Sequence, residues 1–216
     1  MSRVNSTFNI YTMPSEDRQP SHTQGTLTTD IYTMPSADKQ PSYTREAIEL
    51  TLVAVEYCTF LERSNQKERS ELVDTMTKLL PLLYLKATLL PSFASLEEET
   101  YLEDFVTEDE YDFIRSSVSR VMADKDDYLD VFVEDMKYSD TPILATVSEN
   151  LADIYQALKN FVMRYKHASD DSARMEAAIE VKEDFKYNWG QKVANVLRAL
   201  HEVQYSALSQ DDDLTM

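Results

Sequence analysis

The chain of 216 residues is 43% hydrophobic and carries 39 acidic against 21 basic residues, and its net charge of −18 argues against direct binding of nucleic acid or an anionic membrane. Its two glycines and its single cysteine, Cys58, argue against Gly-rich phosphate loops, disulfide frameworks and cysteine-based zinc sites. With neither an apolar run of transmembrane length nor a signal pattern at the N-terminus, the chain is expected to be soluble and cytoplasmic.

The composition of residues 1–42 predicts a disordered tail, because this segment is rich in Ser, Thr, Pro and Gln. The tail contains a tandem repeat, in which IYTMPS occurs at 10–15 and again at 31–36 with a period of 21 residues. Two copies are too few for a solenoid. The repeat is interpreted either as a duplicated motif that docks on a partner or as a recent duplication without a function.

Two helices are predicted next, over about 45–63 and 67–90. Eleven of the 15 residues in 47–61 are apolar, so the first helix is expected to be buried on most sides and to run through the middle of the core. The second helix contains Pro81, which should kink it. The short polar link between the two helices predicts antiparallel packing.

A third helix is predicted to begin after an irregular connection over 91–106. Thr107 and Glu110 have the spacing of a capping box, and the helix should end near residue 123. Residues 124–141 are ambiguous and are expected to be mostly irregular. A strand-like piece or a short helix is the alternative for their apolar residues, which are Tyr128, Leu129, Val131, Phe132, Val133 and Met136.

The cleanest amphipathic pattern predicts a fourth helix over 143–165. Asp140 or Thr141 would cap it, with Pro142 in the first turn. Glu149, Gln156 and Asn160 fall on its polar side. Its apolar stripe has spacings of 4, 3, 4, 3 and 4 and consists of Val147, Leu151, Ile154, Leu158, Phe161 and Tyr165.

The last helical stretch covers 170–208, as one long helix or as two that break at Gly190. Residues 209–216 read as an acidic C-terminal tail. The predicted fold is therefore all-α, a single bundle of five to six helices over 43–208 with tails at both ends.

The negative charge is concentrated in residues 97–140, which hold 16 acidic and four basic residues. Three interpretations remain open: a cation site, a surface that binds a basic partner or imitates nucleic acid, and a solvated face. The calcium-loop template fails because Tyr128 and Leu129 stand where a ligand and a glycine belong. The acids that suggested it are Asp124, Asp126, Asp130 and Asp135.

No catalytic motif is found. The three histidines, His22, His167 and His201, lack metal-ligand spacing, and nothing in the chain has the pattern of a nucleophile elbow, a Walker loop or a Cys–His pair. The sequence therefore predicts no cofactor and no metal site, and it favours a non-enzymatic role.

Two small constellations are candidates for binding. Asp153 lies away from the centre of its apolar stripe, either as a binding residue or as an ordinary surface charge or ion pair. The second constellation is Asn188, Trp189 and Gly190, in which the single Trp precedes a Gly. The Trp is either an aromatic platform in a groove or a core residue packed where Gly permits close approach.

Three segments resemble a bacterial family of small helical proteins known as a domain of unknown function, found in Bacteroidetes and proteobacteria. They are LLYLKATLLP before and at Pro91, SENLADIYQALK at 148–159 and NWGQKVANVLRALH at 188–201. The family often has a His where this chain has Asn188. The likeness covers roughly 44–205, and it implies an all-helical bundle without an established activity. The matching positions are Leu83, Tyr84, Leu90, Pro91, Leu151, Ala152, Asp153, Ile154, Tyr155, Trp189 and Gly190.

Two functions are consistent with these patterns. The first is a protein-interaction or regulatory module whose acidic segment 97–140 binds a basic protein partner. The alternative is a small-ligand-binding protein or weak enzyme with a pocket around Tyr84, Asp153, Tyr155 and Trp189. The sequence leaves the oligomeric state open.

Overall fold

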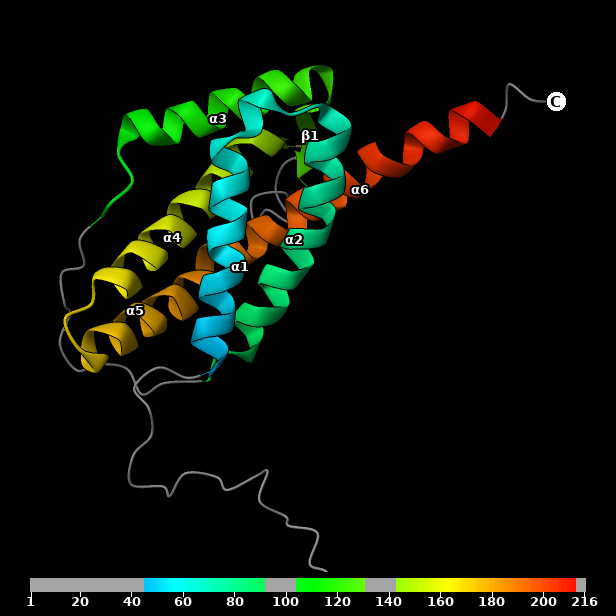
Figure 1. Ribbon diagram of the computed structural model, residues 1–216. Helices are drawn as coiled ribbons and strands as arrows, with labels where there is room; N and C mark the ends of the chain where they lie inside the picture. Colours follow the sequence, from blue (N-terminus) through cyan, green and yellow to red (C-terminus); the bar gives the residue numbers. More distant parts are fainter. Residues whose placement is uncertain (1–44, 92–103, 131–142, 213–216) are drawn as a thin grey trace, which may run out of the picture. The chain divides into compact units, whose positions relative to one another are not determined.

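The computed structural model describes residues 45–91, 104–130 and 143–212. The predicted N-terminal tail with its IYTMPS repeat lies outside these residues, as does Asp135. Within the described part the chain is built from α-helices with one short β-hairpin, which confirms the predicted all-α bundle (Figure 1).

The first two helices, α1 (Arg45–Glu62) and α2 (Arg69–Leu89), are joined by a 3₁₀ turn, η1 (Ser64–Gln66). They pack side by side (Figure 1), and Lys86 of α2 donates to Glu49 of α1 at 2.7 Å. The helix α2 continues through Pro81 to Leu89. The two predicted helices and their antiparallel arrangement are confirmed.

The expectation that α1 is buried on most sides is wrong. One stripe of α1 is fully buried and includes Leu50, Ala54 and Tyr57. The opposite stripe is open to solvent, with Leu52 66% and Val55 43% exposed. Apolar composition alone cannot tell a helix inside the core from one that covers it with a second apolar face outward.

The third helix, α3 (Glu108–Met122), begins as predicted. The Thr107 hydroxyl accepts a hydrogen bond from the Glu110 N–H at 3.2 Å, which satisfies one of the free donors of the first turn. In Figure 1 α3 lies across the end of the α1–α2 pair, and it packs against α4 and η1.

The segment after α3 is more regular than expected. A 3₁₀ turn, η2 (Ala123–Lys125), leads into β1 (Asp127–Asp130), which pairs antiparallel with β2 (Ile143–Thr146). Asp127 faces Thr146 and Asp130 faces Ile143 in this register. The prediction of irregular structure is therefore wrong for 124–130, and 131–141 lies outside the described residues.

The hairpin also moves the start of the fourth helix. The helix α4 spans Val147–His167, and its cap is Thr146, which accepts from the Glu149 N–H at 3.2 Å. Asp126 accepts from the Ser148 N–H at 2.8 Å as well. Residues 143–146 were predicted to be helical, but pairing with β1 draws them into a strand, a contact that local periodicity does not contain.

The helix α4 is the centre of the bundle, since it packs against α1, α3, α5 and α6. Its stripe from Val147 to Phe161 is buried as predicted. Asn160, predicted on the polar side, is only 7% exposed. Its side-chain carbonyl accepts from the N–H groups of Phe105 and Val106 at 2.8 and 3.1 Å. This amide therefore fixes the approach to α3, which is why it tolerates burial.

The last stretch is one continuous helical run with a change of pitch. It comprises α5 (Asp171–Asp184), a π-helical turn, η4 (Phe185–Trp189), and α6 (Gly190–Asp212). Asp170 caps α5 by accepting from the Ala173 N–H at 3.0 Å. Of the two alternatives for 170–208, one long helix or two, the structure therefore shows a single helical run with a π-helical turn immediately before Gly190. The helix α6 extends to Asp212, into the segment read as a C-terminal tail.

Candidate functional site

A polar cleft of about 330 Å³ lies where α4, α5, the π-helical turn and α6 meet. Three of the residues singled out from the sequence line it: Asp153, Asn188 and Trp189. The structure does not bring Tyr84 or Tyr155 to this cleft. The cleft also contains residues that the sequence did not indicate, above all Arg164, Glu180, Asp184 and Lys192.

The π-helical turn shapes one wall of the cleft. A Cβ atom on Gly190 would lie 2.4 Å from the Phe185 carbonyl oxygen, so a larger residue could not sit in this turn without displacing it. Single π-turns inside α-helices recur at functional sites, because they redirect side chains without ending the helix. Here the turn places the Asn188 side chain in the cleft.

Trp189 forms the floor of the cleft and not an exposed platform. It is 1% exposed, and its indole N–H donates to the Val181 carbonyl at 3.2 Å. Its ring meets Phe185 edge-on at 4.7 Å, and Phe185 in turn meets Tyr84 edge-on at 5.0 Å. Tyr84, 43% exposed, therefore supports the π-helical turn from the α2 side.

Asp153 is the centre of a hydrogen-bonded relay between three helices. One carboxylate oxygen accepts from the Tyr111 hydroxyl of α3 at 2.7 Å, and the other pairs with Lys192 of α6. Burial, together with the hydrogen bond to Asp153, raises the pKa of Tyr111, so this phenol stays a donor. Asp153 is thus neither in the core nor in bulk water, and its position at the edge of the stripe was the available signal.

Arg164 holds the opposite end of the cleft. Its side chain is 10% exposed and is pinned between Asp104, at 2.9 Å, and Glu180 of α5. The Asn160 amide donates to the same Asp104 at 3.0 Å. Such a charged group is tolerated at this depth because both of its sides are paired.

Tyr155 belongs to a different cluster, on the α1 and α3 side of α4. Its hydroxyl lies 2.7 Å from Glu110 Oε1 and 3.1 Å from Glu62 Oε1, and Lys159 donates to Glu62 at 2.6 Å. Burial, and next the hydrogen bond with Glu110, raises the pKa of Tyr155. The cluster joins α1, α3 and α4, and it reads as a structural network.

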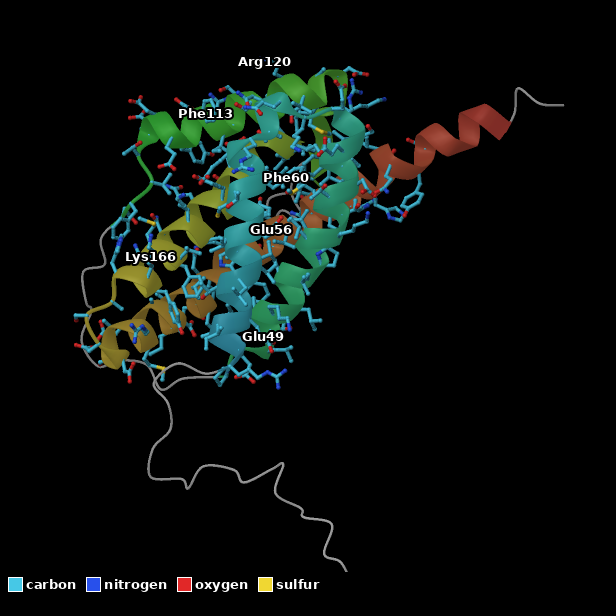
Figure 2. The ribbon with its side chains drawn as sticks, viewed as in Figure 1. Glu49, Glu56, Phe60, Phe113, Arg120 and Lys166 are labelled. Atoms are coloured by element: carbon cyan, nitrogen blue, oxygen red, sulfur yellow. The ribbon has the colours of Figure 1, made fainter. Side chains whose placement is uncertain are left out.

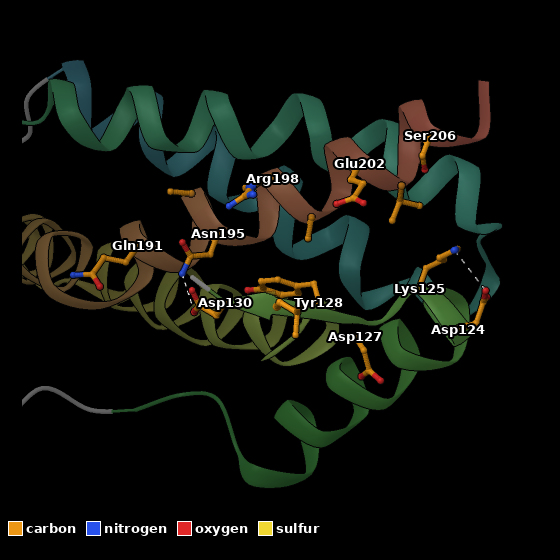
Figure 3. A pocket seen from close by; sticks show the side chains of 14 residues that line it. Asp124, Lys125, Asp127, Tyr128, Asp130, Gln191, Asn195, Arg198, Glu202 and Ser206 are labelled. Atoms are coloured by element: carbon orange, nitrogen blue, oxygen red, sulfur yellow. Dashed lines mark hydrogen bonds and ion pairs between the residues drawn. The ribbon is translucent and has the colours of Figure 1, made fainter. Parts of the chain in front are cut away.

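A larger cavity, of about 830 Å³, runs between α6 and the β1 strand (Figure 3). Its charged residues are spread over three elements: η2 supplies Asp124 and Lys125 at one end, β1 supplies Asp127 and Asp130, and α6 supplies Arg198 and Glu202. Asn195 donates to Asp130 across it at 3.1 Å. Burial raises the pKa of Tyr128, in its wall, to about 12. The cavity holds Asp124 and Asp130, two of the acids that suggested a cation loop, but none of the candidate binding residues, and its charges do not converge as those of the cleft do.

Several acids of segment 97–140 serve the fold. Among the described ones, Asp104, Glu110, Asp126 and Asp130 accept hydrogen bonds from other elements. The described acids among those that suggested a cation loop have separate partners: Asp124 pairs with Arg69, whereas Asp126 is turned toward Ser148. Over the ranges that the structure describes, no group of three His, Cys, Asp or Glu side chains is placed to hold a metal ion.

No helix within those ranges is both long and apolar enough to cross a membrane.

The comparisons with known proteins agree with the resemblance to a helical family of unknown function. No curated protein matches the chain. Among solved structures, protein BF1032 from Bacteroides fragilis is 37% identical, with a TM-score of 0.66 over 77% of this chain and 97% of that chain. The family model described as Domain of unknown function (DUF5063) matches residues 41–206, and the chain belongs to that family.

Proposed function

We propose that this domain binds a small organic cation, with an amine or guanidine group, in the polar cleft. The observation that carries the proposal is the charge of the cleft. It holds four carboxylates and two cations, a surplus of two negative charges in a cleft within the size range of small-molecule sites. The carboxylates are Asp104, Asp153, Glu180 and Asp184, and the cations are Arg164 and Lys192.

Asp184 is the carboxylate with which the cationic group of a ligand would pair. Asp104 and Glu180 are paired with Arg164, and Asp153 is paired with Lys192. Asp184 instead accepts from the Asn188 amide, which carries no charge, and it has no ion pair within the described ranges. An ammonium or guanidinium group beside Asp184 would gain a charge-assisted hydrogen bond. Gln156 and Asn188 would then select for hydrogen-bonding groups on the rest of the ligand.

The negative field of the chain would support such binding, because an excess of one sign of charge concentrates the opposite ion near the cleft. The proposed role is binding and not catalysis. It assumes a cytoplasmic location, in keeping with Cys58, which is a free and buried thiol.

Calorimetric titration of the full chain with putrescine and with agmatine tests the proposal, and succinate is the anionic counterpart. We expect heat of binding for at least one of the two cations and none for succinate. Asp184→Asn should weaken cation binding about tenfold or more, because it removes the charge and keeps the shape.

Glu183→Gln is the matched control, since Glu183 is the neighbouring residue of α5 and pairs with Lys186 outside the cleft. Its affinity should equal that of the wild type. Binding of succinate that Lys192→Gln abolishes would show that the cleft selects anions. An unchanged cation affinity in Asp184→Asn would show that ligands bind elsewhere.

A second candidate function is binding of a basic protein partner by the described part of the acidic segment. Phe113, on the outer side of α3 (Figure 2), is 47% exposed. Glu108, Asp109 and Asp112 lie within two turns of it, so α3 offers an aromatic anchor among acids. A partner captured by immobilised protein should elute below about 0.5 M salt. The Phe113→Ser variant should no longer capture this partner. If the variant still captures it, α3 is not the surface that binds the partner.

A further inference from the structure

The outer surface shared by α1 and α2 is apolar and exposed. Leu52 of α1 is 66% exposed, and Leu85 and Leu89 of α2 are 51% and 52% exposed. The Glu49–Lys86 ion pair joins the two helices. We define the α1–α2 outer surface by its six exposed apolar residues: Ile48, Leu52, Val55, Leu82, Leu85 and Leu89.

Each of the two helices carries its exposed residues in a coiled-coil pattern. On α1 the positions Ile48, Leu52, Val55 and Thr59 follow spacings of 4, 3 and 4. On α2 the spacing repeats in Lys78, Leu82, Leu85 and Leu89. This 3.5-residue repeat is the one by which helices of separate chains interlock. It is distinct from the buried stripe of α1, so α1 has one apolar face for its own core and a second for another helix.

Charge indicates which partner suits this surface. Residues 45–56 and 78–89 hold three basic and three acidic side chains, in a chain whose net charge is −18. Figure 2 shows two of these acids, Glu49 and Glu56, on the outer side of α1. A second copy of so acidic a chain would be repelled most strongly where acids gather, whereas on this surface the basic and acidic side chains balance locally.

We propose that a second copy of this chain packs on the α1–α2 outer surface, with a two-fold axis at the level between residues 50 and 51 of α1, so that α1 and α2 of both copies form a four-helix layer. A two-fold contact brings the same patch of both copies together. With the two α1 helices antiparallel, Arg45 of each copy lies opposite Glu56 of the other. Arg45 is 85% exposed at its side chain, where it pairs with Glu49 of its own helix, and Glu56 has no ion pair within the described ranges. The surface shares no residue with the polar cleft, so this proposal stands apart from the proposed function.

Sedimentation equilibrium of the full chain, at about 1–100 µM and physiological salt, measures the association directly. The wild type should be dimeric in this range. Leu52→Glu places a charge in the middle of the contact and should raise the dimer Kd at least about tenfold. Leu144→Glu is the matched control, because Leu144 of β2 is 62% exposed and lies outside the surface. It should associate like the wild type.

A charge exchange tests the two-fold arrangement itself. Glu56→Arg places like charges opposite each other and should weaken the dimer, and adding Arg45→Glu should restore it. A double variant that associates no better than Glu56→Arg would overturn the antiparallel arrangement. A chain that stays monomeric at every concentration overturns the proposal, whether the surface is then bare or covered by another protein. A dimer whose Kd is unchanged by Leu52→Glu also overturns the proposal.

Discussion

The polar cleft and the α1–α2 outer surface belong to one helical bundle, but the cleft shelters charged groups whereas the outer surface exposes apolar ones. The cleft draws charged and amide groups inward, with the Arg164 side chain 10% exposed above a buried Trp189. The outer surface presents leucines to solvent, with Leu52 two-thirds exposed. Both depart from the ordinary distribution of apolar residues inside and charged residues outside.

The difference shows how each region relates to stability. Groups of the cleft are paired with one another, so removing one leaves its partner buried and unsatisfied. Side chains of the outer surface touch little of their own chain, so removing one should cost the folded monomer little. Stability should therefore respond to changes in the cleft, and association to changes in the outer surface.

The largest effect is expected at the floor of the cleft. Trp189→Ala should lower the free energy of unfolding by about 3–5 kcal/mol, because it empties a fully buried site and removes the bond to Val181. Urea denaturation followed by circular dichroism measures it. Trp189→Phe keeps most of the packing, so its free energy of unfolding should fall less. A loss below about 1 kcal/mol for Trp189→Ala would mean that the floor does not depend on this ring.

Two leucines on α1 test the division between its faces. Leu50 is fully buried, so Leu50→Ala should cost about 2–5 kcal/mol. Leu52→Ala, two residues along, should change the unfolding free energy by less than about 0.5 kcal/mol in dilute solution. Urea titrations of the two variants side by side give the comparison. Equal losses would show that the outer stripe is part of the monomer core.

Gly190 tests the π-helical turn. Gly190→Ala forces a Cβ atom against the Phe185 carbonyl and ring, and it should cost about 1–3 kcal/mol although Ala favours ordinary helices. Thermal unfolding detects the loss. Ala194→Gly, on the same helix, is a control that should destabilise only through helix propensity, by about 1 kcal/mol. A more stable Gly190→Ala variant would show that the turn relaxes to an α-helix without strain.

The smallest effect is a pH dependence from the inner face of α1. Burial raises the pKa of the Cys58 thiol well above its unfolded value of about 8.5. A raised pKa in the folded state adds stability that is fully present below about pH 8.5 and is lost as pH rises toward the folded value. The melting temperature should therefore fall between about pH 8.5 and 10, and less so in Cys58→Ala. If the melting temperature falls equally with pH in the wild type and in Cys58→Ala, the loss of stability comes from the buried tyrosines and not from Cys58.

Local signals in the sequence correctly located most helices. A capping pattern placed the start of α3 at Thr107, the last helical stretch was expected to begin at 170, and the stripe of α4 identified the residues that are buried. These features depend on neighbours within a few residues, so the sequence alone contains them. The spacing that placed Asp153 well away from the centre of its stripe, toward solvent, singled out a residue that lines the cleft.

The rest depended on contacts between distant segments. Pairing of β1 with β2 turned 143–146 into a strand, and contact with Phe105 and Val106 buried Asn160. Lys192 reaches Asp153 from another helix, so no local pattern could join them.

The sequence by itself determined that this protein is an acidic bundle of amphipathic helices, because helix periodicity and capping are local properties of the chain. Only the tertiary structure decided which apolar face of α1 looks inward. It left one apolar stripe of α1 outside and brought charged side chains together in the cleft, since the way helices pack is set by all of their contacts at once.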